Sequence, residues 1–251
     1  MATIGVEHHD KVAVVRLDRG VTNPLNLQLV NELAETLGRL KGNSDVRGLV
    51  LGSANEKFLS IGFDIPQLFE LGEEDFKFFY RAFNRLCLDL YTLPRPTVAA
   101  ITGHAIAGGC ILALCCDYRF IAHGRKLMGL NEIKLGVPVP YPADCILRDL
   151  VGVRHARQMV DSGEFYEPEA LCRMGVVDQA LPLEQVLPAS IEKARLLGTL
   201  PQGAFGLIKG NRVEAVEAQV LAHLDEKEQR FVERWYSAET RGRLTEAMER
   251  F

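Results

Sequence analysis

The 251-residue chain has no run of basic residues, no apolar segment long enough to cross a membrane and no C-x-x-C motif. Its longest apolar run ends at Asp117 and Arg119, short of the ~20 residues that a membrane-spanning helix needs. A net charge of −4 and a pI near 5.9 argue against general binding to nucleic acid or a membrane surface. We therefore expect neither nucleic acid nor membrane among the partners of this chain.

Cysteine is present but is not arranged in pairs that would indicate a zinc site, and the six cysteines lie in apolar surroundings. This pattern predicts buried free thiols in a reducing compartment. The N-terminal residues have neither the basic segment nor the apolar run of a signal peptide. The last residues are not a peroxisomal address of the Ser-Lys-Leu type. Together these features predict a cytoplasmic protein.

The hydrophobic content of 47% and the charged content of 25% fit a globular protein built as one large domain or as a domain with a helical appendage. Strand-like and helix-like periodicities alternate in the first part of the chain, which predicts an α/β fold. The expected strands are residues 11–17, 46–51, 97–101 and 118–122. The expected helices between them are residues 30–40, 76–90 and 109–116.

Strand signals stop after about residue 183. The segments 184–199, 203–211, 214–236 and 238–248 all have helical periodicity. We therefore predict an α/β core over residues 1–190 and a C-terminal helical region over residues 191–251.

Two short segments place glycine where a β-rich stretch turns into a helical one. Residues 58–64 read Phe-Leu-Ser-Ile-Gly-Phe-Asp, and residues 105–110 read Ala-Ile-Ala-Gly-Gly-Cys. Glycine lets the backbone approach a ligand closely, and the start of a helix leaves N–H groups without partners. Two such N–H groups directed at one carbonyl oxygen would form an oxyanion hole.

These segments resemble the crotonase (enoyl-CoA hydratase/isomerase) superfamily, and the resemblance extends from about Val12 to about Leu200. Further matches are Leu-Asp-Arg at 17–19, Pro-Arg-Pro-Thr-Val-Ala-Ala at 94–100 and Gly-Val-Val-Asp at 175–178. The resemblance implies a right-handed spiral of β-β-α repeats followed by a C-terminal helical region. It also implies that the oxyanion hole is made by the N–H groups of Phe63 and Gly108.

Residues 128–138, Met-Gly-Leu-Asn-Glu-Ile-Lys-Leu-Gly-Val-Pro, contain the candidate acid–base residue, Glu132. Taken alone, a glutamate there is more often a solvated surface group. The motif, however, resembles the catalytic segment of Δ3,Δ2-enoyl-CoA isomerases, in which this glutamate is the single acid–base residue. Hydratases of the superfamily carry a second glutamate three residues after the oxyanion glycine, where this chain has Ile111.

Hydration needs a water molecule polarised between two carboxylates, whereas isomerisation needs one base that removes a proton from C2 and returns it at C4. The isoleucine also makes the pocket drier, which should raise the pKa of Glu132. We therefore expect an enoyl-CoA isomerase of fatty acid metabolism. The alternatives are another enolate reaction, such as decarboxylation, retro-Claisen cleavage or weak hydration, and a catalytically silent acyl-CoA-binding protein.

The resemblance places the acyl-CoA thioester, which would be a substrate and not a cofactor, along both glycine segments and the glutamate segment. Asp64 could instead cap the next helix. Lys57 could bind a phosphate group, or it could be a surface lysine that binds no ligand. We expect no metal, nicotinamide or flavin, because neither a ligand cluster nor a dinucleotide motif is present. The expected substrate-binding residues are Lys57, Ser60, Ile61, Gly62, Asp64, Gly109, Ile111 and Asn131.

One face of the C-terminal helical region is apolar, and such a stripe must be covered. It could pack against the core of its own chain or against a neighbouring subunit. The resemblance favours a homotrimer, or a hexamer of two trimers, in which this region contributes to both the interface and the pocket. The stripe consists of Val216, Val220, Leu224, Phe231 and Trp235.

Overall fold

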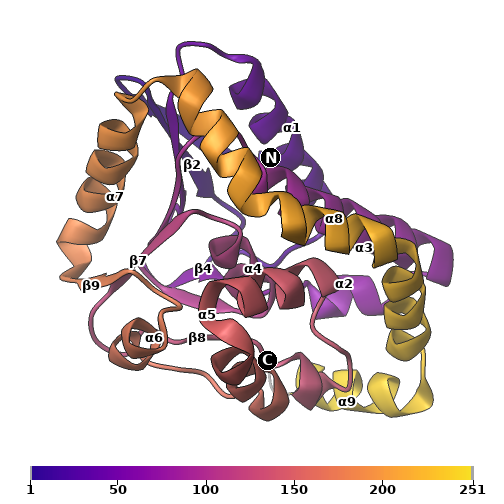
Figure 1. The fold of residues 1–251 in the computed structure, drawn as a ribbon. Coiled ribbons are helices and arrows are strands. Elements are labelled where there is room, and N and C mark those ends of the chain that lie inside the picture. Colours follow the sequence, from indigo (N-terminus) through magenta and orange to yellow (C-terminus); the bar gives the residue numbers. More distant parts are fainter. Residues whose placement is uncertain (1, 250–251) are drawn as a thin grey trace.

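The computed structural model describes residues 2–249, and it confirms the α/β class. Its larger sheet, of which β2, β7 and β9 are labelled in Figure 1, has the strand order β1-β2-β3-β5-β7-β9. Strand β1 is antiparallel to β2, and the other neighbours are parallel. The strands are β1 (Ile4–His9), β2 (Val12–Leu17), β3 (Gly48–Ser53), β5 (Thr97–Ile101), β7 (Tyr118–Ala122) and β9 (Gln179–Leu181).

The two outer strands, β1 and β9, are absent from the strands expected from the sequence. Strand β1 has no buried residue, because its sequence is Ile-Gly-Val-Glu-His-His and it lies at an edge of the sheet. Strand β9 has only three residues and no fully buried side chain. Neither strand therefore carries the hydrophobic pattern by which a strand is recognised in a sequence.

A second, smaller sheet brings three distant segments of the chain together. Its parallel strands are β4 (Phe58–Ser60), β6 (His104–Ile106) and β8 (Met128–Gly129), in that order. Each follows a strand of the larger sheet and precedes a helix, so that the chain repeats a β-β-α unit. Because the carboxyl ends of parallel strands meet at one edge, the segments after Ser60, Ile106 and Gly129 become neighbours.

The helices expected from the sequence are present, but two of them form a single helix, and the helices over residues 65–69, 132–135, 141–162 and 168–174 lie outside the expected ranges. Residues 203–211 and 214–236 are parts of one 34-residue helix, α8, because buried Val213 continues the helix where we expected a break. The helices are α1 (Leu27–Gly42), α2 (Ile65–Phe69), α3 (Glu73–Tyr91), α4 (Gly108–Leu114), the 3₁₀ helix η1 (Glu132–Leu135), α5 (Tyr141–Ser162), α6 (Pro168–Met174), α7 (Leu183–Gly198), α8 (Gln202–Trp235) and α9 (Ala238–Met248).

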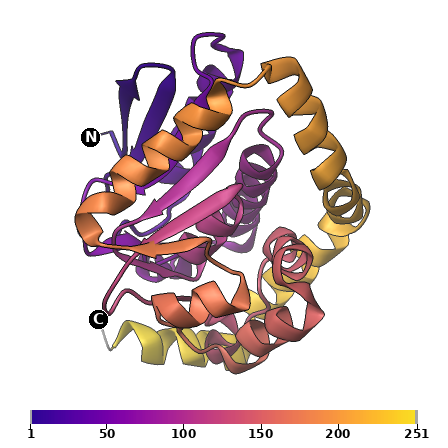
Figure 2. The ribbon, with the colours of Figure 1, turned by 60° about the vertical axis from the view of Figure 1, so that its left-hand side comes forward.

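Helix α7 lies across one face of the larger sheet, as Figure 2 shows. Val186 and Ala194 of this helix are fully buried against Val50 and Val98 of the sheet. The boundary expected between residues 190 and 191 therefore falls inside a helix that belongs to the sheet layer. The helical region that leaves the sheet begins at α8.

The apolar stripe of α8 packs against its own chain, mainly against α3 and α5. The Phe231 ring stacks on Tyr80 with centroids 4.0 Å apart, and the Trp235 ring stacks on Phe76 at 4.3 Å. Of the two alternatives for this stripe, packing against the core of the chain is the one that the structure shows. The stripe therefore gives no argument for a subunit interface.

The beginning of α8 is held by a buried ion pair. Lys209, which is 1% exposed, donates to Asp117 Oδ2 at 2.8 Å and to the Arg95 carbonyl at 3.2 Å. The same carboxylate accepts from the backbone N–H and the hydroxyl of Thr97 at 2.9 and 3.0 Å. Arg212 also contacts Asp117. A single carboxylate thus joins α8 to strand β5.

We predict that Asp117→Ala lowers the free energy of unfolding by about 3–5 kcal/mol, because it leaves the ammonium of Lys209 buried without its counter-ion. The matched control is Asp89→Ala, which removes the exposed pair with Arg85 (3.0 Å) and should cost less than about 1 kcal/mol. Urea denaturation followed by circular dichroism compares the two variants. Equal losses would contradict the anchoring role of Asp117.

Candidate active site

A cavity of about 780 Å³ lies where the three strands of the smaller sheet end. One wall comes from the segments after β4, β6 and β8, and the opposite wall comes from α8 and α9. Three of the residues in this lining are the ones expected to do chemistry, Phe63, Gly108 and Glu132. The structure therefore brings together three segments that lie far apart in the sequence.

The two glycine segments touch each other at their backbones. A Cβ on Gly62 would lie 2.9 Å from Ala107 Cβ and 3.0 Å from the Gly108 nitrogen, and Gly62 has a φ of +99°. A residue other than glycine would fit here only with strain. Among the described residues, neither the Phe63 N–H nor the Gly108 N–H donates to a protein acceptor. Both N–H groups can therefore donate to a ligand in the cavity.

The start of α4 has an unusual backbone conformation. Ala107, which precedes the helix, has a φ of +48°, a region that residues with a side chain rarely adopt. Such conformations persist only where the surrounding packing enforces them, and they cluster at functional sites. The next residues fit closely, since a Cβ on Gly109 would lie 2.3 Å from the Ser60 carbonyl oxygen. The sequence shows the glycines but not the strain at Ala107.

The ring of Phe63 is held by the aromatic side chains of α3. It makes edge-to-face contacts with Phe79 and Phe83, with centroids 4.9 Å apart in both pairs. These two rings are fully buried, so they give Phe63 a rigid support. The bulky residue that follows the first glycine thereby fixes the position of its own N–H.

Glu132 is the first residue of η1, and only 6% of it is exposed. Its Oε2 atom is buried and has no hydrogen-bond partner among the described residues. Burial raises the pKa of this carboxyl from 4.5 to about 7. Ile111, at the position where the resemblance places the second glutamate of hydratases, lines the same cavity and is buried. The site thus combines one basic carboxylate with two free N–H donors.

Comparison with known proteins agrees with this geometry. The family described as enoyl-CoA hydratase/isomerase matches residues 7–251. The chain belongs to the enoyl-CoA hydratase/isomerase family. It is 31% identical to human mitochondrial enoyl-CoA delta isomerase 1 over 222 residues, which cover 88% of this chain and 74% of that protein. It is also 29% identical to the short-chain-enoyl-CoA hydratase of Clostridium acetobutylicum, over 75% of this chain and 72% of that one.

Solved structures of the family show the same fold. The crystal structure of human mitochondrial Δ3-Δ2-enoyl-CoA isomerase matches with a TM-score of 0.95 and 29% identity, over 99% of this chain and 97% of that one. An enoyl-CoA hydratase/isomerase from Mycobacterium paratuberculosis matches with a TM-score of 0.90 at 21% identity, over 98% of both chains, a likeness of fold alone. The expected crotonase-like architecture is confirmed, whereas the reaction is not decided by family membership.

Among the expected substrate-binding residues, four line the cavity: Ile61, Asp64, Ile111 and Asn131. Asp64 also caps α2, because its Oδ1 accepts from the Gln67 N–H at 3.2 Å, and it pairs with Arg19 at 2.7 Å. The carboxylate of Asp64 is thus already engaged by the protein.

Asn131 precedes Glu132, but it does not cap η1 with its side chain. Its Oδ1 atom is buried and has no partner among the described residues, and no hydrogen bond from its amide group to the Glu132 carboxylate is found there. The orientation of Glu132 must therefore come from the backbone of η1 and from its packing.

Four expected binding residues lie outside the cavity lining: Lys57, Ser60, Gly62 and Gly109. The Ser60 hydroxyl donates to the Asn23 carbonyl at 2.7 Å and accepts from the Gly62 N–H at 3.0 Å, so this hydroxyl holds the loop. Gly62 and Gly109 allow the close contact of the backbones described above. Lys57 is exposed next to Phe58, which does line the cavity.

Several cavity residues were not expected from the sequence. Phe165 contributes from the segment after α5, and Arg243, Glu246 and Ala247 contribute from α9. Their local sequence has no motif, since they reach the cavity only because α9 folds back over it. Ring stacking at Phe231 and Trp235 places the end of α8 beside the cavity and so directs α9 toward it.

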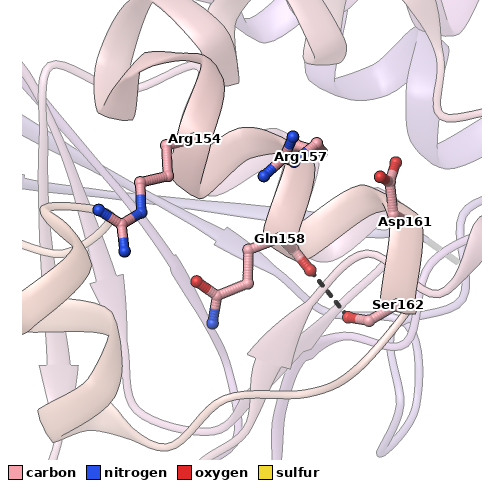
Figure 3. A pocket seen from close by; sticks show the side chains of 5 residues that line it. All are labelled: Arg154, Arg157, Gln158, Asp161 and Ser162. Atoms are coloured by element: carbon pink, nitrogen blue, oxygen red, sulfur yellow. Dashed lines mark hydrogen bonds between the residues drawn. The ribbon is translucent and has the colours of Figure 1, made fainter.

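A second hollow, of about 460 Å³, lies on the outer side of α5 and is shown in Figure 3. Its lining is Arg154, Arg157, Gln158, Asp161 and Ser162, all of them exposed. The Ser162 hydroxyl donates to the Gln158 carbonyl at 2.8 Å. This hollow has none of the residues of the site described above.

None of the helices described is both long and apolar enough to cross a membrane. All six cysteines are free thiols, of which five are buried, as expected. Among residues 2–249, no three His, Cys, Asp or Glu side chains are grouped so that they could hold a metal ion.

The raised pKa of Glu132 makes the stability of the protein depend on pH. The folded state holds this proton up to about pH 7, whereas the unfolded chain releases it near 4.5, so ionisation destabilises the fold as the pH rises through this window. Glu132→Gln removes this loss of folding free energy, because the amide does not ionise. We predict that the variant gains stability over the wild type between these pH values, by up to about 3 kcal/mol. Urea denaturation at several pH values measures the difference, and a difference independent of pH would contradict the buried acid.

Proposed function

We propose that this chain is an enoyl-CoA isomerase that moves a double bond from C3 to C2 of an acyl-CoA thioester. The observation that carries the proposal is one buried glutamate that shares a cavity with two unpaired N–H donors and an isoleucine. The likeness to proteins named enoyl-CoA delta isomerase supports it. Relatives named enoyl-CoA hydratase make hydration the competing reaction.

In the proposed reaction, the thioester oxygen accepts hydrogen bonds from the N–H groups of Phe63 and Gly108. Ionised Glu132 removes a proton from C2. The C2–H electron pair forms a C1–C2 double bond and the carbonyl π pair moves onto the thioester oxygen, which gives a dienolate that keeps the C3–C4 double bond. The two N–H donors stabilise this charge, and the start of α4 adds the positive end of its dipole. Glu132 then returns the proton at C4, which leaves the double bond between C2 and C3.

A raised pKa suits this double role. A carboxylate with an ordinary pKa would be a weak base toward C2, whereas a group with a pKa of about 7 both accepts and releases a proton at neutral pH. Ile111 would leave a water molecule without the second carboxylate that hydration requires. Exposed Lys57, beside the cavity, would be available to a phosphate group of coenzyme A.

We predict that Glu132→Gln keeps the fold and the binding of acyl-CoA but lowers kcat by ~10²–10⁴-fold or more, because the amide cannot accept the C2 proton. Glu246→Gln is the matched control, since Glu246 also lines the cavity but is exposed, and it should keep kcat. An absorbance assay of the conversion of a 3-enoyl-CoA to the 2-enoyl-CoA measures kcat for both variants. Near-normal turnover by Glu132→Gln would remove this residue from the mechanism.

We also propose a homotrimer, alone or paired into a hexamer, with an interface at the beginning of α8. Leu207 and Ile208 are 72% and 68% exposed there, next to half-exposed Leu200 at the end of α7. Burial of such side chains between copies would remove apolar surface from water.

The assembly proposal predicts that Leu207→Glu together with Ile208→Glu yields monomers, because each copy would place two charges in a buried apolar interface. Val153→Glu alters an equally exposed side chain on α5, 70% exposed, and should leave the assembly unchanged. Multi-angle light scattering measures the mass of each variant. A wild-type mass near 27.9 kDa would contradict the trimer.

A further inference from the structure

A single backbone carbonyl connects the C-terminal helices to the glutamate segment. The oxygen of Gly136 accepts from the Thr240 hydroxyl at 2.9 Å and from Arg234 Nε at 2.9 Å. Thr240 is fully buried, and Arg234 also pairs with Glu239. Gly136 ends η1, the four-residue helix that begins at Glu132.

Besides α9, the short helix η1 contacts α5, and Lys134 pairs with Glu164 at 2.7 Å, but Glu132 itself has no ion pair among the described residues. The Glu132 carbonyl accepts from the Val137 N–H at 3.1 Å, whereas its buried Oε2 has no partner among the described residues. The position of the carboxylate is therefore set by the backbone of η1. The Gly136 carbonyl lies at the opposite end of this helix, so a group that holds this carbonyl also holds the helix.

The residues around the turn between α8 and α9 also contact α2 and the loop that follows it. The Tyr236 hydroxyl donates to the Leu71 carbonyl at 2.7 Å, and Arg241 donates to the Phe69 carbonyl at 2.9 Å with its guanidinium 3.2 Å from the Phe69 ring. Phe69 belongs to α2, which directly follows Phe63 and Asp64. The end of the chain thus spans both the proposed oxyanion segment and the glutamate segment.

We infer that Thr240 and Arg234 are positioning residues, which hold Glu132 at a fixed distance from the proposed oxyanion hole by fixing the Gly136 carbonyl. This inference rests on the proposed isomerase function. A small displacement of a reacting group is enough to lower a rate strongly, since a 1 Å error can cost about 10²-fold. The two residues act through Glu132 and need not contact the substrate.

The test variant is Thr240→Val, which keeps the shape of the side chain and removes its hydroxyl. We expect kcat to fall about tenfold with KM unchanged, because the substrate pocket stays intact while the carboxylate is displaced. Thr240→Ser restores the hydroxyl and should restore kcat. Thr245→Val is the matched control on α9, because the Thr245 hydroxyl donates only to the Arg241 carbonyl of its own helix (3.0 Å).

The pH profile of kcat separates a positioning role from a structural one. If η1 loosens, water reaches Glu132, its pKa falls toward 4.5, and the midpoint of the profile moves to lower pH. Tyr80 and Cys110, the titratable neighbours that interact with Glu132, both have a pKa raised by burial, so they do not titrate near neutrality. The charged groups that line the same cavity are Asp64, Lys134, Arg243 and Glu246. His104 lines it too, and burial lowers the pKa of its imidazole.

A second pair of variants covers the case in which Thr240→Val does not fold. Arg234→Met removes the other donor to Gly136, whereas Glu239→Gln removes only the ion pair of Arg234. The inference requires a lower kcat and a shifted midpoint in Arg234→Met and neither change in Glu239→Gln. Unchanged kcat and midpoint in the folded donor-deficient variants would overturn it. Absence of isomerase activity in the wild type would overturn the proposed function instead.

Discussion

The site depends on the contact between two backbones at Gly62 and Gly108. Because the Gly62 backbone lies against the Gly108 nitrogen, no side chain can separate the two loops. The smaller sheet brings strands β4 and β6 side by side, and the backbone of Ala107 takes a positive φ at the turn into α4. The two N–H groups are therefore fixed before any ligand binds, so a developing negative charge could be stabilised with little reorganisation.

The second property of the site is that the Glu132 carboxyl is buried beside apolar side chains. Ile111 lies three residues after Gly108 on a fully buried helix. Aromatic rings of α3 pack around Phe63, and one ring of α3 stacks in turn on Phe231 of α8. A carboxylate in such a place is poorly solvated, which raises the pKa of Glu132 to about 7. The rest of the fold must offset the free-energy cost of ionising this buried carboxylate. The proposed isomerase chemistry uses both properties.

Most of the core strands and helices could be predicted because hydrophobic periodicity is a local property. The meeting of Glu132 and the two glycine segments at one cavity could be predicted because each lies in a recognisable motif. Edge strand β1 could not, since its side chains are exposed. The inward hydrogen bonds of Ser60, and which residues of α9 reach the cavity, depend on long-range packing, although the resemblance predicts that the C-terminal region contributes to the pocket. Thr240 and Gly136, for example, are 104 positions apart, and Thr240 belongs to no motif.

The central claim is that one dry carboxylate beside two fixed N–H donors transposes a double bond and does not add water. The most direct measurement incubates the purified protein with a 3-enoyl-CoA and, separately, with a 2-enoyl-CoA, and identifies the products by mass spectrometry and NMR. The account predicts interconversion of the two isomers with unchanged mass and no hydroxyacyl-CoA at a comparable rate. Rapid formation of a 3-hydroxyacyl-CoA, with a gain in mass of one water, would contradict it.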